Sequence, residues 1–159
     1  MRTRSLAIWA AKCLLLVLAL GLAAWAADPQ VGTWKLNREK SKFSPGPGNQ
    51  SMTLTIVGIP NGYHLTGEGM DADGKPIHVE YTARYDGKDN PATGLPYGDT
   101  VAVKRIDQNT IEGTTKKGGV VTMTVRSTVS ADGKTRTSVF HGKNAQGQEV
   151  NNVVVYDKQ

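Results

Sequence analysis

The sequence predicts an all-β protein, an antiparallel meander closed into a single β-barrel after an N-terminal signal peptide. Three observations predict this fold class. Residues 1–26 have the composition of a secretory signal, residues 27–159 are rich in β-branched side chains, and turn-forming pairs such as Asp-Gly recur along the chain. Residues 27–159 are enough for one domain with its own core, and we expect no second domain.

The amino-terminal segment 1–26 has the three parts of a secretory signal peptide. Cations come first, an unbroken apolar run follows over 13–23, and Ala24-Trp25-Ala26 puts small residues at the third and first places before a cut after Ala26. The apolar stretch is shorter than the roughly 20 residues that a membrane-spanning helix needs. We therefore expect cleavage and a secreted or periplasmic protein without a stable membrane anchor; the alternative is an uncleaved anchor.

Cysteine content and charge exclude several classes of function. Cys13 is the only cysteine and lies in the signal peptide, so the mature chain has no disulfide and no thiol nucleophile. Of the 19 Lys and Arg residues, three lie in residues 1–26, which hold no acidic residue, so a formal net charge of +5 falls to +2. This weak positive charge argues against a nucleic-acid partner, which needs a dense basic face.

The composition of residues 27–159 favours strands over helices. Val, Ile and Thr contribute 34 residues, against 11 for Leu and Ala together. Branching at Cβ restricts rotamers in a helix and suits the pleated surface of a sheet. Apolar residues alternate with period two, and no window shows an apolar stripe at helical spacing. The predicted strands are 32–36, 51–58, 63–70, 76–85, 99–106, 110–116, 120–129, 135–142 and 149–157.

The connections predict how these strands are joined. Asn-Gly and Asp-Gly pairs supply the positive φ angles of tight hairpins, and consecutive hairpins make an antiparallel meander. A meander this long removes its exposed edges by closing into a barrel, with a two-sheet sandwich as the alternative. Two long loops are expected at 37–50 and 86–98, since Pro91 and Pro96 exclude regular pairing in the second.

Two short motifs carry a resemblance to a known superfamily. Gly32-Thr33-Trp34 opens the first predicted strand, and Val155-Tyr156-Asp157 lies in the last. This pairing resembles the calycins, the superfamily of lipocalins and fatty-acid-binding proteins, in which a Gly-x-Trp strand closes the barrel against the last strand. The run from Leu36 to Gly46 is also similar to a group of small secreted bacterial proteins called lipocalin-like. The resemblance implies a closed barrel that encloses a small ligand.

Catalytic and metal-binding residues are not predicted. His64 and His78 fall on polar faces of their strands, and no two histidines have a spacing that brings them together, so neither a metal nor another cofactor is expected. The sequence has no Gly-x-Ser-x-Gly nucleophile motif. Paired carboxylates fall in turns, where they cap the backbone. A barrel enzyme of isomerase or hydrolase type is kept as an alternative, but we expect no enzyme.

The inward face of the predicted barrel supplies the candidate ligand-binding residues. Few large aliphatic residues are available to fill it, which favours room for one ligand. The candidate ligand-binding residues are Trp34, Tyr81, Tyr85, Arg105, Met123 and Tyr156.

Arg105 is the one charged residue among these candidates. It is in phase with Val101 and Val103, so inward-pointing valines would carry it inside the barrel or to its rim. Related barrels often hold a carboxylate with an Arg-x-Tyr on the last strand; this chain has Val154-Val155-Tyr156 there, so Arg105 could replace that arginine. The alternative is that Arg105 abuts the turn at Asp107 and swings outward.

Two functional hypotheses remain from the sequence. The first is a secreted or periplasmic lipocalin-like barrel, expected to be a monomer, that binds a small, partly apolar or acidic molecule. The second is a structural or envelope-stress protein with a filled barrel that acts through its loops. A fold alone does not decide between them, because one fold supports many functions.

Overall fold

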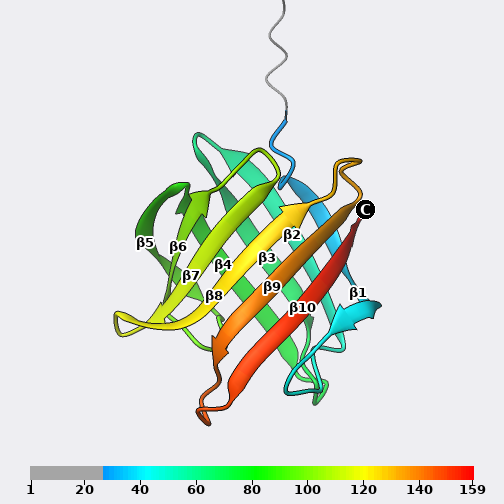
Figure 1. The fold of residues 1–159 in the computed structure, drawn as a ribbon, viewed down its shortest axis with the longest axis vertical. Helices are drawn as coiled ribbons and strands as arrows, with labels where there is room; N and C mark the ends of the chain where they lie inside the picture. Colours follow the sequence, from blue (N-terminus) through cyan, green and yellow to red (C-terminus); the bar gives the residue numbers. More distant parts are fainter. Residues whose placement is uncertain (1–26) are drawn as a thin grey trace, which may run out of the picture.

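The computed structural model describes residues 27–159, which form a closed barrel of ten antiparallel strands and no helix (Figure 1). The predicted signal peptide, residues 1–26, lies outside the described residues. The strands are β1 (Gly32–Lys42), β2 (Ser51–Ile59), β3 (Gly62–Met70), β4 (Pro76–Arg84), β5 (Asp86–Thr93), β6 (Thr100–Arg105), β7 (Thr110–Lys117), β8 (Val120–Val129), β9 (Thr135–Lys143) and β10 (Glu149–Lys158). Among the described residues there is accordingly no helix long and apolar enough to cross a membrane.

Each strand pairs with its neighbours in sequence, and β1 closes the barrel by pairing with β10. Trp34 lies opposite Lys158 and Leu36 opposite Tyr156 in this closing pair. The β2–β3 hairpin turns through Asn61 at a φ of 55°, as its Asn-Gly sequence predicts. The predicted all-β meander and its closure into a barrel are therefore confirmed.

The predicted loop at 86–98 is wrong over its first half, where β5 forms. Ala92 donates its N–H to the carbonyl oxygen of Asp99, so the nitrogen of the preceding Pro91 points the other way, towards β4. On that side β5 pairs with β4 only through Ala92 and Thr93. Pro91 therefore removes no hydrogen bond from the sheet, which is the condition under which a strand accepts proline.

The predicted loop at 37–50 is likewise too long, because β1 continues to Lys42. The register between β1 and β10 shifts between Asn37 and Lys42, so this half of β1 bulges away from its partner. The bulge is tied back by side chains: the Ser41 hydroxyl accepts the N–H of Val155 at 2.9 Å. A bulge at a barrel rim bends its strand and redirects the chain beyond it, and here that chain is a loop over residues 43–50.

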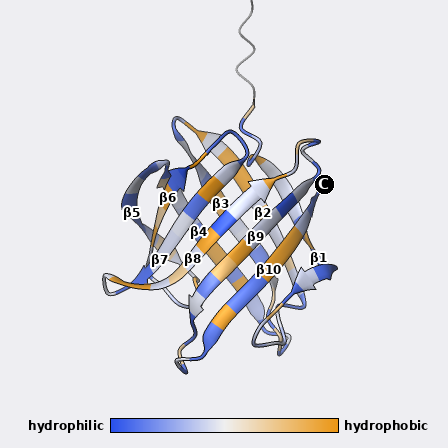
Figure 2. Cartoon of the chain, in the orientation of Figure 1, coloured by the Kyte–Doolittle hydropathy of each residue, from blue (hydrophilic) through white to orange (hydrophobic). Residues whose placement is uncertain are grey.

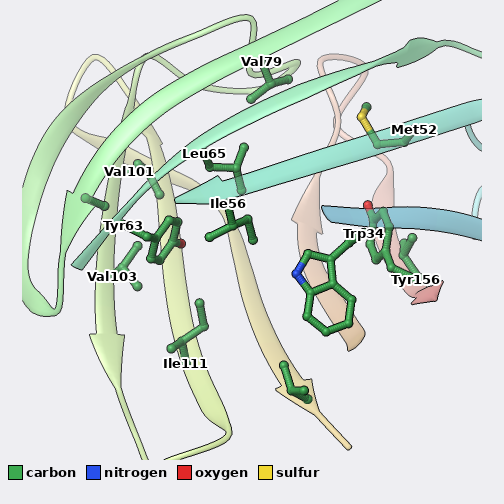
Figure 3. Close-up of a cluster of buried hydrophobic side chains, with 13 residues drawn as sticks. Trp34, Met52, Ile56, Tyr63, Leu65, Val79, Val101, Val103, Ile111 and Tyr156 are labelled. Carbon is green, nitrogen blue, oxygen red and sulfur yellow. The ribbon is translucent and has the colours of Figure 1, made fainter. Parts of the chain in front are cut away.

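Alternate residues of each strand point into the barrel and form its core. Hydrophilic and hydrophobic residues accordingly both occur along the strands, as the hydropathy colouring of Figure 2 shows. The buried hydrophobic cluster draws side chains from eight of the ten strands. The close-up in Figure 3 shows Trp34, Ile56, Tyr63 and Leu65 among the side chains of this cluster. All four are at most 4% exposed, so the core packs most tightly around them.

One end of the barrel is closed by the segment that precedes β1. Gln30 is completely buried there, and its side-chain amide donates to the carbonyl oxygen of Asn109 at 2.8 Å. The Trp34 indole N–H donates to the carbonyl oxygen of Gln30 at 2.9 Å. This segment plugs the end of the barrel, and access to the interior is from the opposite end.

Candidate functional site

Two adjoining cavities occupy the interior of the barrel. The mouth cavity, of about 240 Å³, lies at the open end. The inner cavity, of about 190 Å³, lies deeper. Both are lined in part by Asn49, Leu95, Phe140 and Tyr156, so the two spaces share a boundary. Together they fall in the lower part of the range of roughly 300–1,000 Å³ that small-molecule sites occupy.

The mouth cavity is framed by the two loops at the open end. The β1–β2 loop contributes Phe43 and two prolines, and the β5–β6 loop contributes Leu95 and Tyr97. Gly48 packs directly on the Phe43 ring: a Cβ at this position would lie 2.2 Å from the ring carbons. Only glycine allows this approach, so Gly48 holds Phe43 against the mouth.

The inner cavity contains a buried cation, Arg136 on β9. Arg136 is 4% exposed, and its Nε and Nη1 atoms have no hydrogen-bond partner within residues 27–159. No carboxylate of the described residues forms an ion pair with it. Charged side chains are almost never buried unless paired, because desolvation costs several kcal/mol. Arg136 is therefore an unmatched positive charge on the wall of a cavity.

Three tyrosines surround this cation and also line the inner cavity. Tyr63 and Tyr81 place their hydroxyl oxygens 3.3 Å apart, and Tyr156 lies opposite Arg136 in the β9–β10 register. Burial raises the pKa of the Tyr156 phenol to about 12, although the positive charge of Arg136 acts in the opposite direction. Burial also raises the pKa of Tyr63 and Tyr81. All three are neutral phenols at physiological pH and leave the charge of Arg136 unbalanced.

The inward face of β9 changes from polar to apolar towards the mouth. Arg136 is the deepest, Ser138 follows two residues on, and Phe140 reaches the boundary of the mouth cavity. The Ser138 hydroxyl pairs with that of Ser127 on β8 at 2.8 Å, and both residues are 3% exposed. The cavity is therefore suited to a molecule with an anionic head deep in the barrel and an apolar tail towards the mouth.

The structure separates the six candidate residues into two groups. Tyr81 and Tyr156 line the inner cavity, and Met123 and Tyr156 line the mouth cavity. Trp34, Tyr85 and Arg105 line neither cavity. They lie towards the plugged end, and their part in ligand binding stays a prediction that the cavity walls do not support.

Arg105 binds the plug, the segment of residues 27–31 that closes one end of the barrel. Its guanidinium forms an ion pair with Asp28, donates to the carbonyl oxygen of Gln108 at 2.9 Å, and stacks 4.0 Å from the centre of the Tyr85 ring. The Tyr85 hydroxyl donates to the same Asp28 carboxylate at 2.5 Å. Burial and then this carboxylate raise the pKa of Tyr85. With its charge neutralised by Asp28, Arg105 fastens residues 27–31 to the barrel.

Arg136 was missed because its strand carries no clear apolar face. The sequence over 135–142 alternates Arg136, Ser138 and Phe140 with Thr135, Thr137 and Val139. Either set could face inward by hydropathy alone. The available signal was Phe140, the only large hydrophobic side chain of the strand: it is in phase with Arg136, and placing it inside places the arginine inside.

Within residues 27–159 no group of three or more His, Asp or Glu side chains is arranged to hold a metal ion. His78 lies on the outer face, as its alternation predicts, and its Nδ1 is 2.6 Å from a Glu68 carboxylate oxygen. Hydrogen bonds that the His78 ring donates to the carboxylates of Glu68 and then Glu80 raise the pKa of His78. These pairs are exposed on the surface of β3 and β4 and lie outside the cavities.

No protein-family model matches this sequence, and no curated protein matches it. Among solved structures, the chain is similar to zebrafish ileal bile acid-binding protein in complex with cholic acid, at 11% sequence identity and a TM-score of 0.47. The match covers 82% of this chain and 99% of that one. A similarity at this level carries no argument about family or ligand, and the functional argument rests on the side chains of this barrel.

Proposed function

We propose that this protein is a non-catalytic, exported binding protein that holds a small, partly apolar acid inside its barrel. The observation that carries the proposal is Arg136, a cation without a hydrogen-bond or ion-pair partner for its Nε and Nη1 atoms, on the wall of a cavity. A carboxylate beside it replaces the lost hydration with charge-assisted hydrogen bonds, which are among the stronger polar contacts in proteins.

The apolar remainder of the cavity indicates the chemistry of the rest of the ligand. Leu36, Phe43, Leu95 and Phe140 give the mouth an apolar wall, and burial of apolar ligand surface contributes roughly 25 cal/mol per Å² before the costs of association. An apolar tail therefore gains from lying between the loops at the open end. Proteins keep an unfavourable buried charge where function requires it, and this arrangement is of that kind.

A head-group comparison tests the proposal. Ligand-free protein comprising residues 27–159 is titrated with dodecanoate, dodecanol and dodecyltrimethylammonium, which share a tail and differ in charge. Displacement of the fluorescent anion anilinonaphthalene sulfonate reports binding. We expect dodecanoate to bind at least about ten-fold more tightly than dodecyltrimethylammonium, which corresponds to about 1.4 kcal/mol.

The same titration distinguishes the alternative function. Arg126 is a matched control, because it faces outward on β8 and pairs with Glu112; Arg126→Met should leave the order of affinities unchanged. Equal affinity for the three head groups would remove the acidic specificity. Failure of all three to bind would favour the structural protein that acts through its loops.

A further inference from the structure

The Ser127–Ser138 pair places a second polar group on the wall of the inner cavity. The two hydroxyl oxygens are 2.8 Å apart, and each residue is 3% exposed. Only one of the two hydroxyl hydrogens can lie in the bond between them. The pair therefore has one hydrogen left to donate, as well as lone pairs to accept, inside a largely apolar space.

Its position relative to Arg136 is fixed by the strand. Ser138 follows Arg136 by two residues on the same inward face, which is about 6.6 Å along a strand. Phe140 comes next, so the wall beyond the serines is apolar. A ligand with its acid at Arg136 would pass the hydroxyl pair within its first few carbons and then meet only apolar surface on β9.

A plain alkyl chain fits this wall poorly. Methylene groups beside the serine pair shield its spare hydrogen from water and offer no acceptor, and an unsatisfied buried donor is costly. A ligand hydroxyl at that level can both accept from the pair and donate to it. Sites built around a hydrogen bond to a hydroxyl discriminate strongly against the analogue that lacks it.

We propose that the natural ligand is a hydroxylated acid, with a hydroxyl group a few carbons from the carboxylate that bonds to the Ser127–Ser138 pair. This inference rests on the proposed function, because it takes the carboxylate to lie at Arg136. It assigns the two serines as specificity-determining residues. They act by contact with the ligand hydroxyl, and they disfavour a ligand that offers no partner for their spare hydrogen.

The test compares acids that differ only in the hydroxyl. Dodecanoate, α-hydroxydodecanoate, β-hydroxydodecanoate and ω-hydroxydodecanoate are titrated against ligand-free residues 27–159. A hydroxyl makes an acid more soluble in water and weakens its binding to an apolar wall. We nevertheless expect the better of the α- and β-hydroxy acids to bind about ten-fold more tightly than dodecanoate, and the ω-hydroxy acid to bind no more tightly than dodecanoate.

The double variant Ser127→Ala/Ser138→Ala should reverse this order, with dodecanoate the tightest ligand. Removing both partners of a hydrogen bond is close to neutral for folding, so the variant should remain a barrel. Ser51→Ala, which changes an exposed serine on β2, is the control and should keep the wild-type order.

Three results would overturn the inference while leaving the proposed function intact. In the first, the wild-type protein binds dodecanoate more tightly than both the α- and β-hydroxy acids. In the second, it binds the ω-hydroxy acid as tightly as the better of the α- and β-hydroxy acids. In the third, the double variant still binds the α- or β-hydroxy acid more tightly than dodecanoate. Because the first two need only the wild type, the test stands even if the variant fails to fold. Failure of every acid to bind would instead contradict the proposed function.

Discussion

Replacing Arg136 by methionine should make the ligand-free protein more stable and the protein a poorer binder of acids. Methionine matches the flexible stem of arginine without its charge, so it fills the volume of the stem and leaves that of the guanidinium to the cavity. Arg136 is 4% exposed and lacks partners for Nε and Nη1. Most substitutions of a buried, well-packed side chain destabilise, so the predicted sign is unusual.

The magnitude follows from the two unpaired donors. An unsatisfied buried polar group costs about 1–3 kcal/mol, and more when it is charged. Relaxation of the arginine and loss of its remaining contacts offset part of this gain, so we expect Arg136→Met to raise the free energy of unfolding by about 1–3 kcal/mol. For a domain of this size that is an increase in Tm of roughly 3–10 °C.

Bound dodecanoate should reverse the order of stability of the wild type and Arg136→Met. Hydrogen bonds to charged groups contribute about 1.5–3 kcal/mol, so losing Arg136 should weaken dodecanoate binding by roughly 10- to 100-fold. Dodecanoate at about 100 times its wild-type Kd should stabilise the wild type by about 2.7 kcal/mol and the variant much less. Thermal denaturation with and without dodecanoate measures both effects.

The outward-facing Arg126→Met is the control for the charge change itself. Its ion pair with Glu112 is about half exposed, so its loss should change stability by under about 1 kcal/mol and leave affinity unaltered. If Arg136→Met instead lowers Tm in the absence of ligand, the arginine is a structural element and the reasoning from its unpaired donors is refuted.

Three further predictions concern the plug, the outer surface and export. Asp28→Ala should lower the free energy of unfolding by about 2 kcal/mol with dodecanoate affinity unchanged, because it removes the partner of Arg105 and of the Tyr85 hydroxyl. Glu149→Ala is the control, since it breaks an exposed ion pair with Lys143. An equal loss of stability in this control would show that the plug has no special role. His78 has a raised pKa through Glu68 and Glu80, so its stabilisation is present below its unfolded pKa of about 6.5 and is lost as pH rises through the folded value. Urea titrations should therefore show His78→Gln losing more stability at about pH 5 than at about pH 9, and a loss independent of pH would contradict this. Amino-terminal sequencing of exported protein should begin at Ala27 or Asp28; a retained Met1 would refute cleavage.

The sequence was sufficient for the strands that obey simple local rules. Alternation in 63–70 and 120–129, together with glycine at the turns, predicted hairpins that the structure confirms. β5 was missed because proline was taken as an exclusion, whereas Pro91 directs its nitrogen to the side with little pairing. Whether proline costs the sheet a hydrogen bond depends on which strand its nitrogen faces, and the sequence around Pro91 does not contain that information.

The site was only partly predictable for a similar reason. Tyr81 and Tyr156 belong to strands with a clear apolar face, so their inward direction could be deduced. Arg105 was in phase with two buried valines, but the preceding plug supplies Asp28 from 77 positions away and takes up its charge. Arg136 lies on a strand with polar residues on both faces, where Phe140 alone indicates which face points inward. Pairing with Tyr156 and Val129 sets its orientation.

A crystal structure of residues 27–159 with bound dodecanoate tests the central claim most directly. The carboxylate should lie within hydrogen-bond distance of Arg136 Nε or Nη1, with the alkyl chain running past Phe140 towards the loops at 43–49 and 95–97. A dodecanoate bound in the reverse direction would contradict the claim. So would an inner cavity that holds only ordered water around Arg136 at saturating dodecanoate.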